Sequence, residues 1–264
     1  MQFIMLITLY VIIIIVNVFS VYSYFVKLIS VSSGKWSTSG MLFQMLNAIP
    51  RSIGVFQIPL ITFYTEWAIN NNINLKVEIF IGIVLAIWIG LLIGWLSLKY
   101  FYLVFSYSVN HITERQSFSS FFRNSITILL GNGTWKNQTQ NLIKIKLFKI
   151  GNHKLFIYNA IGFFLMSIAL PCFLWASYHL PNYRASLNSF VSMITGLASI
   201  FILFMVDSRI ALYTDKAFSG DMNLGEYSEK LLDVTRGRLL GTFFVLLLFI
   251  PISDLLIRFL KYFL

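Results

Sequence analysis

Residues 79–98, IFIGIVLAIWIGLLIGWLSL, contain no charged side chain. An α-helix crosses the roughly 30 Å core of a bilayer with about 20 predominantly apolar residues, so this stretch predicts a membrane-spanning helix. Small residues recur here at every fourth position, at Gly82, Ala86, Gly90 and Gly94. Small residues at that spacing let two helix backbones approach closely, so we expect this face to pack against another helix.

The rest of the chain has the same apolar character. Of its 264 residues, 58% are hydrophobic and 11% are charged, whereas soluble domains carry about 25% charged residues. The mean hydropathy is +0.77. We therefore predict an all-α, polytopic integral membrane protein with a single domain over residues 1–264 and about six transmembrane helices, several of them broken by proline or glycine. The six segments lie near residues 2–28, 39–68, 77–107, 155–180, 186–206 and 237–260.

Basic residues gather in the loops expected after the first, third and fifth segments. Cytoplasmic loops carry an excess of Lys and Arg, so both termini are expected outside and the loops 108–154 and 207–236 inside. In the first loop, the stretch 118–129 predicts an amphipathic helix in the membrane interface. Residues 142–150 indicate either a strand or a basic segment docked on anionic lipids. Four acids of the second loop are expected to be solvated: Asp221, Glu226, Glu229 and Asp233.

The stretch NAIPRSIGVFQIP, residues 47–59, places an arginine inside the second apolar segment. An arginine at the centre of a lipid-facing helix costs about 2.5–3.5 kcal/mol on insertion scales, so Arg51 is expected to face protein or a water-filled cavity. On a helix, Gln44 and Asn47 share its face. Either Arg51 pairs with a buried carboxylate, or its planar fork binds an anionic group of a substrate. Acids near the predicted spans are few and lie at their ends, which favours the substrate.

The first segment also carries a polar face. Asn17, Ser20, Tyr24 and Lys27 follow one another at spacings of three or four residues, and side chains at those spacings share one side of a helix. We expect this face to be buried against neighbouring helices, with the lysine reaching toward the interface.

Motifs of several enzyme classes are missing from the sequence. It has no Gly-x-x-x-x-Gly-Lys phosphate loop and no His-Glu-x-x-His motif, and its three histidines lack metal-ligand spacing. No nucleophile has a recognisable base partner. Cys172 is the only cysteine, so the chain forms no intrachain disulfide. We expect no enzymatic activity, metal or cofactor, and no nucleic-acid partner.

Four stretches resemble the Amj family of bacterial lipid II flippases, the alternates to MurJ. They are SYFVKLISVSSGK (23–35), PRSIGVFQIPL (50–60), ITGLASIFILFMVDSRIALYTDKAFSGD (194–221) and RGRLLGT (236–242). The resemblance covers most of the chain and is weakest in the middle loop. The chain departs from the family pattern at Lys27, where arginine is usual, and at Ser208, where proline is usual. The resemblance implies translocation of undecaprenyl-diphosphate-linked disaccharide-pentapeptide from the inner to the outer leaflet of the cytoplasmic membrane for cell-wall synthesis.

Site residues follow from that implied function. Arg51 is expected to bind the diphosphate near the middle of the membrane, basic residues to collect the head group at the cytoplasmic face, and polar residues to line the path. Two acids are expected to hold or gate the basic groups. The basic residues are Lys27, Lys35, Arg209, Arg236 and Arg238; the polar ones are Asn17, Gln44, Asn47, Gln57, Ser192 and Thr195; the acids are Asp207 and Asp215.

Other functions and partners stay open at this point. The chain could carry a different polyprenyl-linked sugar, act as a non-transporting scaffold of cell-wall assembly, or act as an enzyme on a lipid phosphate. Phosphate contacts do not report which sugar is attached. The expected partners are lipid II, anionic membrane lipids and a second copy of the chain, bound through the small-residue faces of 77–107 and 237–260.

Replacing Arg51 tests the first of these site assignments. We expect Arg51→Ala to abolish lipid II translocation in proteoliposomes at matched insertion, because the substrate's diphosphate loses its partner within the membrane. Transport that survives the substitution would make this arginine a structural residue.

Overall fold

The computed structural model describes residues 2–71, 73, 77–110 and 153–263. In these ranges the chain is helical and contains no strand. The segments 118–129 and 142–150 lie outside the described residues. The elements are α1 (Gln2–Ser33), α2 (Trp36–Asn70), α3 (Val77–Asn110), α5 (His153–His179), the 3₁₀ turn η2 (Pro181–Tyr183), α6 (Arg184–Ile202), the π-helical turn η3 (Leu203–Asp207), α7 (Ser208–Ser219) and α8 (Leu224–Phe263).

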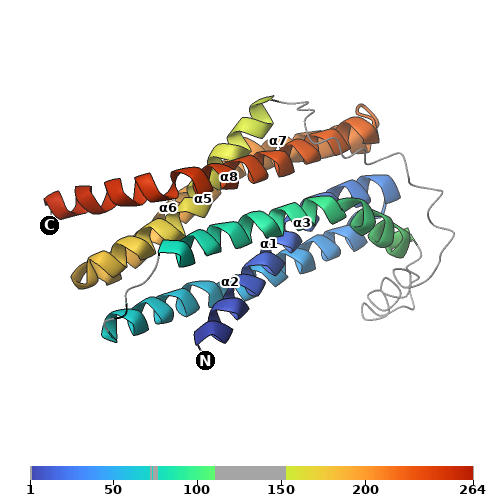
Figure 1. The fold of residues 1–264 in the computed structure, drawn as a ribbon. Coiled ribbons are helices and arrows are strands. Elements are labelled where there is room, and N and C mark those ends of the chain that lie inside the picture. Colours follow the sequence, from blue (N-terminus) through green and yellow to red (C-terminus); the bar gives the residue numbers. More distant parts are fainter. Residues whose placement is uncertain (1, 72, 74–76, 111–152, 264) are drawn as a thin grey trace.

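The helices make six passes along one axis of the molecule (Figure 1). Both chain ends lie on the left of that view, and the α1–α2 and α7–α8 turns lie on the right. Among the described residues, five stretches are long and apolar enough to span a membrane: Met5–Ser33, Val77–Tyr107, Lys154–His179, Pro181–Ser219 and Leu224–Tyr262. With α2 packed along α1, this arrangement agrees with the prediction of about six helices in a multi-pass membrane protein.

The six passes divide into two halves of three. Helices α1, α2 and α3, blue to green in Figure 1, form one half, and α5, α6 and α8, yellow to red, form the other. Each half is held by extensive contacts, of α1 with α2 and α3 and of α5 with α6 and α8, whereas contacts between the halves are sparser. A binding site between the halves is therefore lined from both.

Small-residue faces hold each half together. A Cβ atom on Gly90 of α3 would lie 2.6 Å from the carbonyl oxygen of Ile14 in α1, and one on Gly237 of α8 would lie 2.6 Å from that of Phe156 in α5. The expected close packing thus occurs inside the chain. Since both faces are buried there, a homodimer, which stays a prediction, would need another surface.

The stretch expected as a loop at 207–236 is almost entirely helical. Helix α6 continues through η3 into α7, and α8 begins at Leu224. The helix continues through Ser208, and Gly220 ends α7 in the left-handed conformation, with φ of 86°. This part of the prediction was wrong because an amphipathic pattern buries Ile210 and Ala217 of α7.

Prolines do not end the helices that contain them. Pro171 lies inside α5 and Pro251 inside α8, and α2 is helical from Trp36 to Asn70. In membrane helices, neighbouring groups satisfy the backbone that a proline leaves free, which allows the helix to continue. The departure from α-helical geometry occurs instead at η3, where the sequence has no proline.

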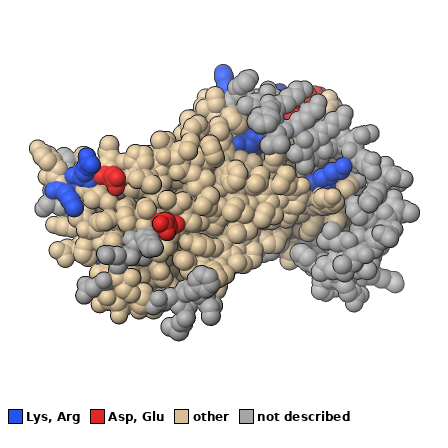
Figure 2. Space-filling model, viewed as in Figure 1, with Lys and Arg blue, Asp and Glu red and all other residues tan. Residues whose placement is uncertain are grey.

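The outer surface is apolar between charged ends. In Figure 2, charged side chains lie toward the left and right ends of the visible face, with an uncharged band between them. Large apolar side chains are exposed along α6, η3 and α8, including Phe190, Leu197, Phe204, Leu247 and Leu255. Such a band suits contact with lipid.

Enlarging Gly237 tests the α5–α8 contact. We expect Gly237→Ala to lower the free energy of unfolding by about 1–3 kcal/mol. The added methyl group would clash with the backbone of α5, which cannot rotate away as a side chain can. The matched control is Gly196→Ala on α6, where a Cβ meets nothing within 4 Å. Thermal unfolding of the purified protein in detergent measures both; equal melting temperatures for the two variants would contradict the prediction.

Candidate substrate cavity

A cavity of about 550 Å³ lies where the two halves meet. That volume is within the range of about 300–1,000 Å³ typical of small-ligand sites. Its polar lining comes from α1, α2, α5, α6, η3 and α8. These residues are Asn17, Ser20, Ser23, Tyr24, Gln57, Ser167, Thr195, Ser199, Asp207 and Arg238.

Arg238 of α8 is the cation that lines this cavity. Its side chain is 4% exposed, and its Nη1 donates to the backbone oxygen of Ser20 at 3.1 Å and to the Ser20 hydroxyl at 2.7 Å. The guanidinium carbon lies 4.2 Å from the ring centroids of both Tyr24 and Phe163. Its buried Nε has no hydrogen-bond partner. Among the described residues it makes no ion pair, so the cavity holds a buried positive charge with an unused donor.

The packing of α8 on α5 fixes the position of Arg238. Gly237 and Gly241 bring the two backbones together, and the amide of the buried Asn159 donates to the backbone oxygen of Val234. Phe163, one turn further along α5, then lies against the guanidinium. The ring offers a face to the cation without neutralising its charge.

A second cation shares the ring of Tyr24. The Nζ of Lys27 lies 5.6 Å from the centroids of Tyr24 and Phe43. We call Phe163, Arg238, Tyr24, Lys27 and Phe43 the cation–aromatic cluster. It joins α1, α2, α5 and α8, so it connects the two halves of the fold.

Asp207 meets this cluster through a hydroxyl group. The Tyr24 hydroxyl donates to Oδ1 of Asp207 at 2.6 Å. Asp207 is the last residue of η3, and π-helical turns occur frequently at functional sites. The acid predicted to hold or gate basic groups therefore lies next to them.

Five residues of the predicted site line the cavity: Asn17, Gln57, Thr195, Asp207 and Arg238. The amide nitrogen of Gln57 is buried there without a hydrogen-bond partner. Lys27 adjoins the cavity through its contact with Tyr24. The side chains of Arg51 and Asn47 lie outside the described residues, so their roles stay predictions.

The other predicted residues lie elsewhere. Lys35 donates to the backbone oxygen of Val109 at 3.0 Å, and the Arg209 guanidinium stacks 4.8 Å from the centroid of Tyr158. Arg236 is in an ion pair. Gln44, Ser192 and Asp215 are exposed and do not line the cavity.

Sequence reasoning left out of its site list several residues that line the cavity. Ser20 and Tyr24 were recognised as part of a polar face of the first segment, but were interpreted as packing. The same spacing that predicted a buried face could have indicated a cavity wall. Ser199 follows Thr195 by four residues, so the sequence places it on the same helix face as a predicted site residue, whereas Ser23 and Ser167 carry no distinguishing signal.

The chain is similar to one known protein family. The model of a family described as Amj, Alternate to MurJ, matches residues 11–260. The chain belongs to the Amj family. No curated protein and no solved structure matches it. The matched range of this Amj protein includes every residue that lines the cavity.

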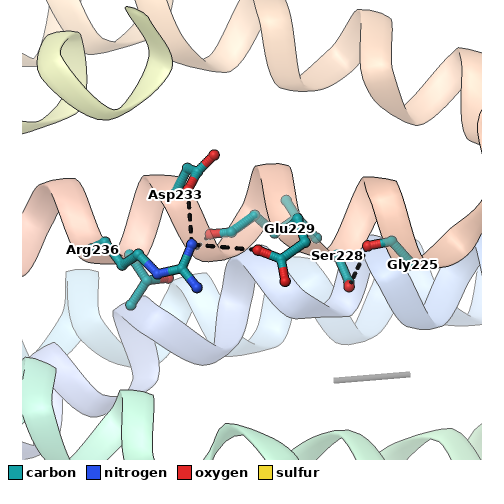
Figure 3. A network of polar contacts seen from close by, with 7 residues as sticks. Gly225, Ser228, Glu229, Asp233 and Arg236 are labelled. Carbon is teal, nitrogen blue, oxygen red and sulfur yellow. Dashed lines mark hydrogen bonds and ion pairs between the residues drawn. The ribbon is translucent and has the colours of Figure 1, made fainter. Parts of the chain in front are cut away.

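Arg236 of this Amj protein lies two residues before Arg238 on α8 but, unlike Arg238, has carboxylate partners among the described residues. Nη1 of Arg236 lies 2.9 Å from Oδ1 of Asp233 and 3.4 Å from Oε2 of Glu229, all on α8 (Figure 3). Asp233 is 0% exposed, so its expected solvation was wrong. The reason is that α8 begins before these residues and places them on a buried helical face. Among the described residues, no group of three or more His, Cys, Asp or Glu side chains could hold a metal ion.

Breaking this ion pair is expected to destabilise the fold. Arg236→Met should lower the free energy of unfolding by about 3–5 kcal/mol, because the buried Asp233 carboxylate loses the guanidinium. The double variant Arg236→Met/Asp233→Leu should recover most of that loss, since the buried carboxylate is removed together with its partner. Thermal unfolding compares the three proteins, and a double variant no more stable than the single one would contradict the prediction.

Proposed function

We propose that this Amj-family protein is a flippase that moves lipid II from the inner to the outer leaflet of the bacterial cytoplasmic membrane for cell-wall synthesis. The observation that carries the proposal is Arg238, a buried guanidinium without an ion pair among the described residues, in a cavity with polar side chains in its lining between membrane-spanning helices. The family match supports it, since the family is described as an alternate to MurJ.

The cavity chemistry fits the diphosphate of such a lipid. A guanidinium donates along two edges and matches phosphate oxygens, and its hydrogen bonds strengthen where water is excluded. The unpartnered Nε of Arg238 and amide of Gln57 are donors that an anionic ligand can use. Lys27 adds a second positive charge nearby.

The cavity has room for only part of the proposed substrate, and the remaining parts would lie on the surfaces beside it. About 550 Å³ encloses a drug-sized group, enough for the diphosphate and an adjoining sugar but not for the whole disaccharide-pentapeptide. The peptide would extend along the exposed polar side of α6, past Ser192 and Ser199. The polyprenyl tail would stay in the bilayer beside the apolar surface.

The orientation follows from charge and belongs to the same proposal. The basic residues of α7 and the start of α8 face the cytoplasm, and both termini lie outside, as the Lys and Arg distribution indicates. Binding of the diphosphate to the cavity involves no covalent step, so the proposed activity is transport. Another polyprenyl-linked sugar would make the same phosphate contacts, and competition between lipid substrates distinguishes it.

Neutralising Arg238 tests the proposed function. We expect Arg238→Gln to weaken lipid II binding by about 10- to 100-fold, because hydrogen bonds to charged groups contribute about 1.5–3 kcal/mol. Arg238→Lys should lose less, since it keeps the charge but not the fork. Binding to nanodiscs and translocation in proteoliposomes are the measurements.

The matched control is Arg258→Gln, which makes the same change at an exposed position of α8. Arg258→Gln should bind and translocate lipid II as the wild-type protein does. Transport by Arg238→Gln at the wild-type rate would overturn the role of this arginine. An inserted wild-type protein that does not move lipid II would shift the proposal to another polyprenyl-linked substrate or to a scaffold.

A further inference from the structure

We propose that Asp207 is an internal counter-anion for Arg238 and Lys27, held away from them by the Tyr24 hydroxyl until this bond breaks and the carboxylate displaces the substrate phosphate. The inference rests on the proposed function, because it names how the same cavity alternates between binding and release. It concerns four side chains from both halves of the fold, Tyr24 and Lys27 of the first half, and Asp207 and Arg238 of the second.

The two cations are available in this structure. Arg238 donates to two neutral oxygens of Ser20, and Lys27 lies over two rings. Among the described residues, neither makes an ion pair. Aromatic faces stabilise a cation without cancelling its charge, so the cluster keeps its attraction for an anion.

Asp207 is the carboxylate among the residues lining this cavity. It lies close enough to Lys27 and Tyr24 to interact with both electrostatically. Unit charges a few ångströms apart attract strongly where water is scarce, so a free carboxylate here would move onto a cation. The Tyr24 hydroxyl binds it instead, at 2.6 Å. A hydrogen bond from a neutral hydroxyl to a carboxylate is strong enough to hold it in place.

The backbone geometry at Asp207 allows its carboxylate to change direction. Residues 203–207 form the π-helical turn, and α-helix resumes at Ser208. Side-chain direction changes where the helical period changes, so a small adjustment of this turn redirects Asp207. The Tyr24–Asp207 bond also crosses between the halves, so relative motion of the halves breaks it.

Two states of the cavity follow. With the bond made, Arg238 in the cavity lining and Lys27 beside it attract the diphosphate. With the bond broken, Asp207 neutralises them and displaces the phosphate, which releases the head group. A carboxylate that replaces the substrate in this way prevents a strongly cationic site from retaining it.

Two nearly isosteric substitutions separate these states. Tyr24→Phe keeps the ring under both cations but frees Asp207, and should weaken binding of lipid II and of undecaprenyl diphosphate about tenfold or more, as close charge pairs in desolvated sites do. Asp207→Asn removes the competitor, so it should bind both lipids more tightly and translocate lipid II more slowly. The double variant Tyr24→Phe/Asp207→Asn should regain at least wild-type affinity.

The full chain in nanodiscs and proteoliposomes serves for all variants. Tyr22→Phe is the control, because it removes a tyrosine hydroxyl on the same helix that bonds Ser97 at 2.6 Å outside the cavity lining; its affinity should match wild type. Wild-type affinity in Tyr24→Phe, or a double variant as weak as Tyr24→Phe, would overturn the inference alone. A wild-type protein that neither binds nor moves these lipids would overturn the proposed function and the inference with it.

Discussion

The contact of α8 with α5 leaves no room for a side chain at Gly237 or Gly241, and the polar interior depends on it. Membrane helices gain little from burying apolar surface, because lipid is as apolar as protein, so close packing and interhelical hydrogen bonds determine their association. Here backbone meets backbone, and Asn159 adds a buried hydrogen bond. Arg238 is carried into the interior by this contact, where it meets Phe163.

Two buried arginines of α8, Arg236 and Arg238, have different surroundings. Arg236 is 5% exposed and has carboxylate partners on its own helix, so its charge is compensated. Arg238 is as deeply buried, but its neighbours are rings and neutral oxygens. Aromatic faces lower the cost of burying the second cation while leaving its field in place.

The sequence predicts the architecture well because the relevant signals are local. Length and hydropathy indicate the spans, and four-residue repeats of small side chains indicate which faces touch, as Gly90 and Gly237 do. The site is predicted less well. Arg238 was placed at a cytoplasmic helix start because the apolar run begins at residue 237, whereas α8 begins at Leu224. Neither the π-helical turn before Ser208 nor the pairing of Tyr24 with Asp207 has a local signal, since both depend on how distant helices meet.

The division into two halves has a mechanical consequence. Each three-helix half is held by extensive contacts between its helices, while the seam between the halves contains a cavity. Rocking one half against the other therefore leaves both interiors intact. The resistance to such rocking is concentrated in the links across the seam, including Arg238 to Ser20 and Tyr24 to Asp207. The groups that line the cavity are thus the same groups that link the two halves, which makes occupancy of the cavity and the shape of the protein interdependent.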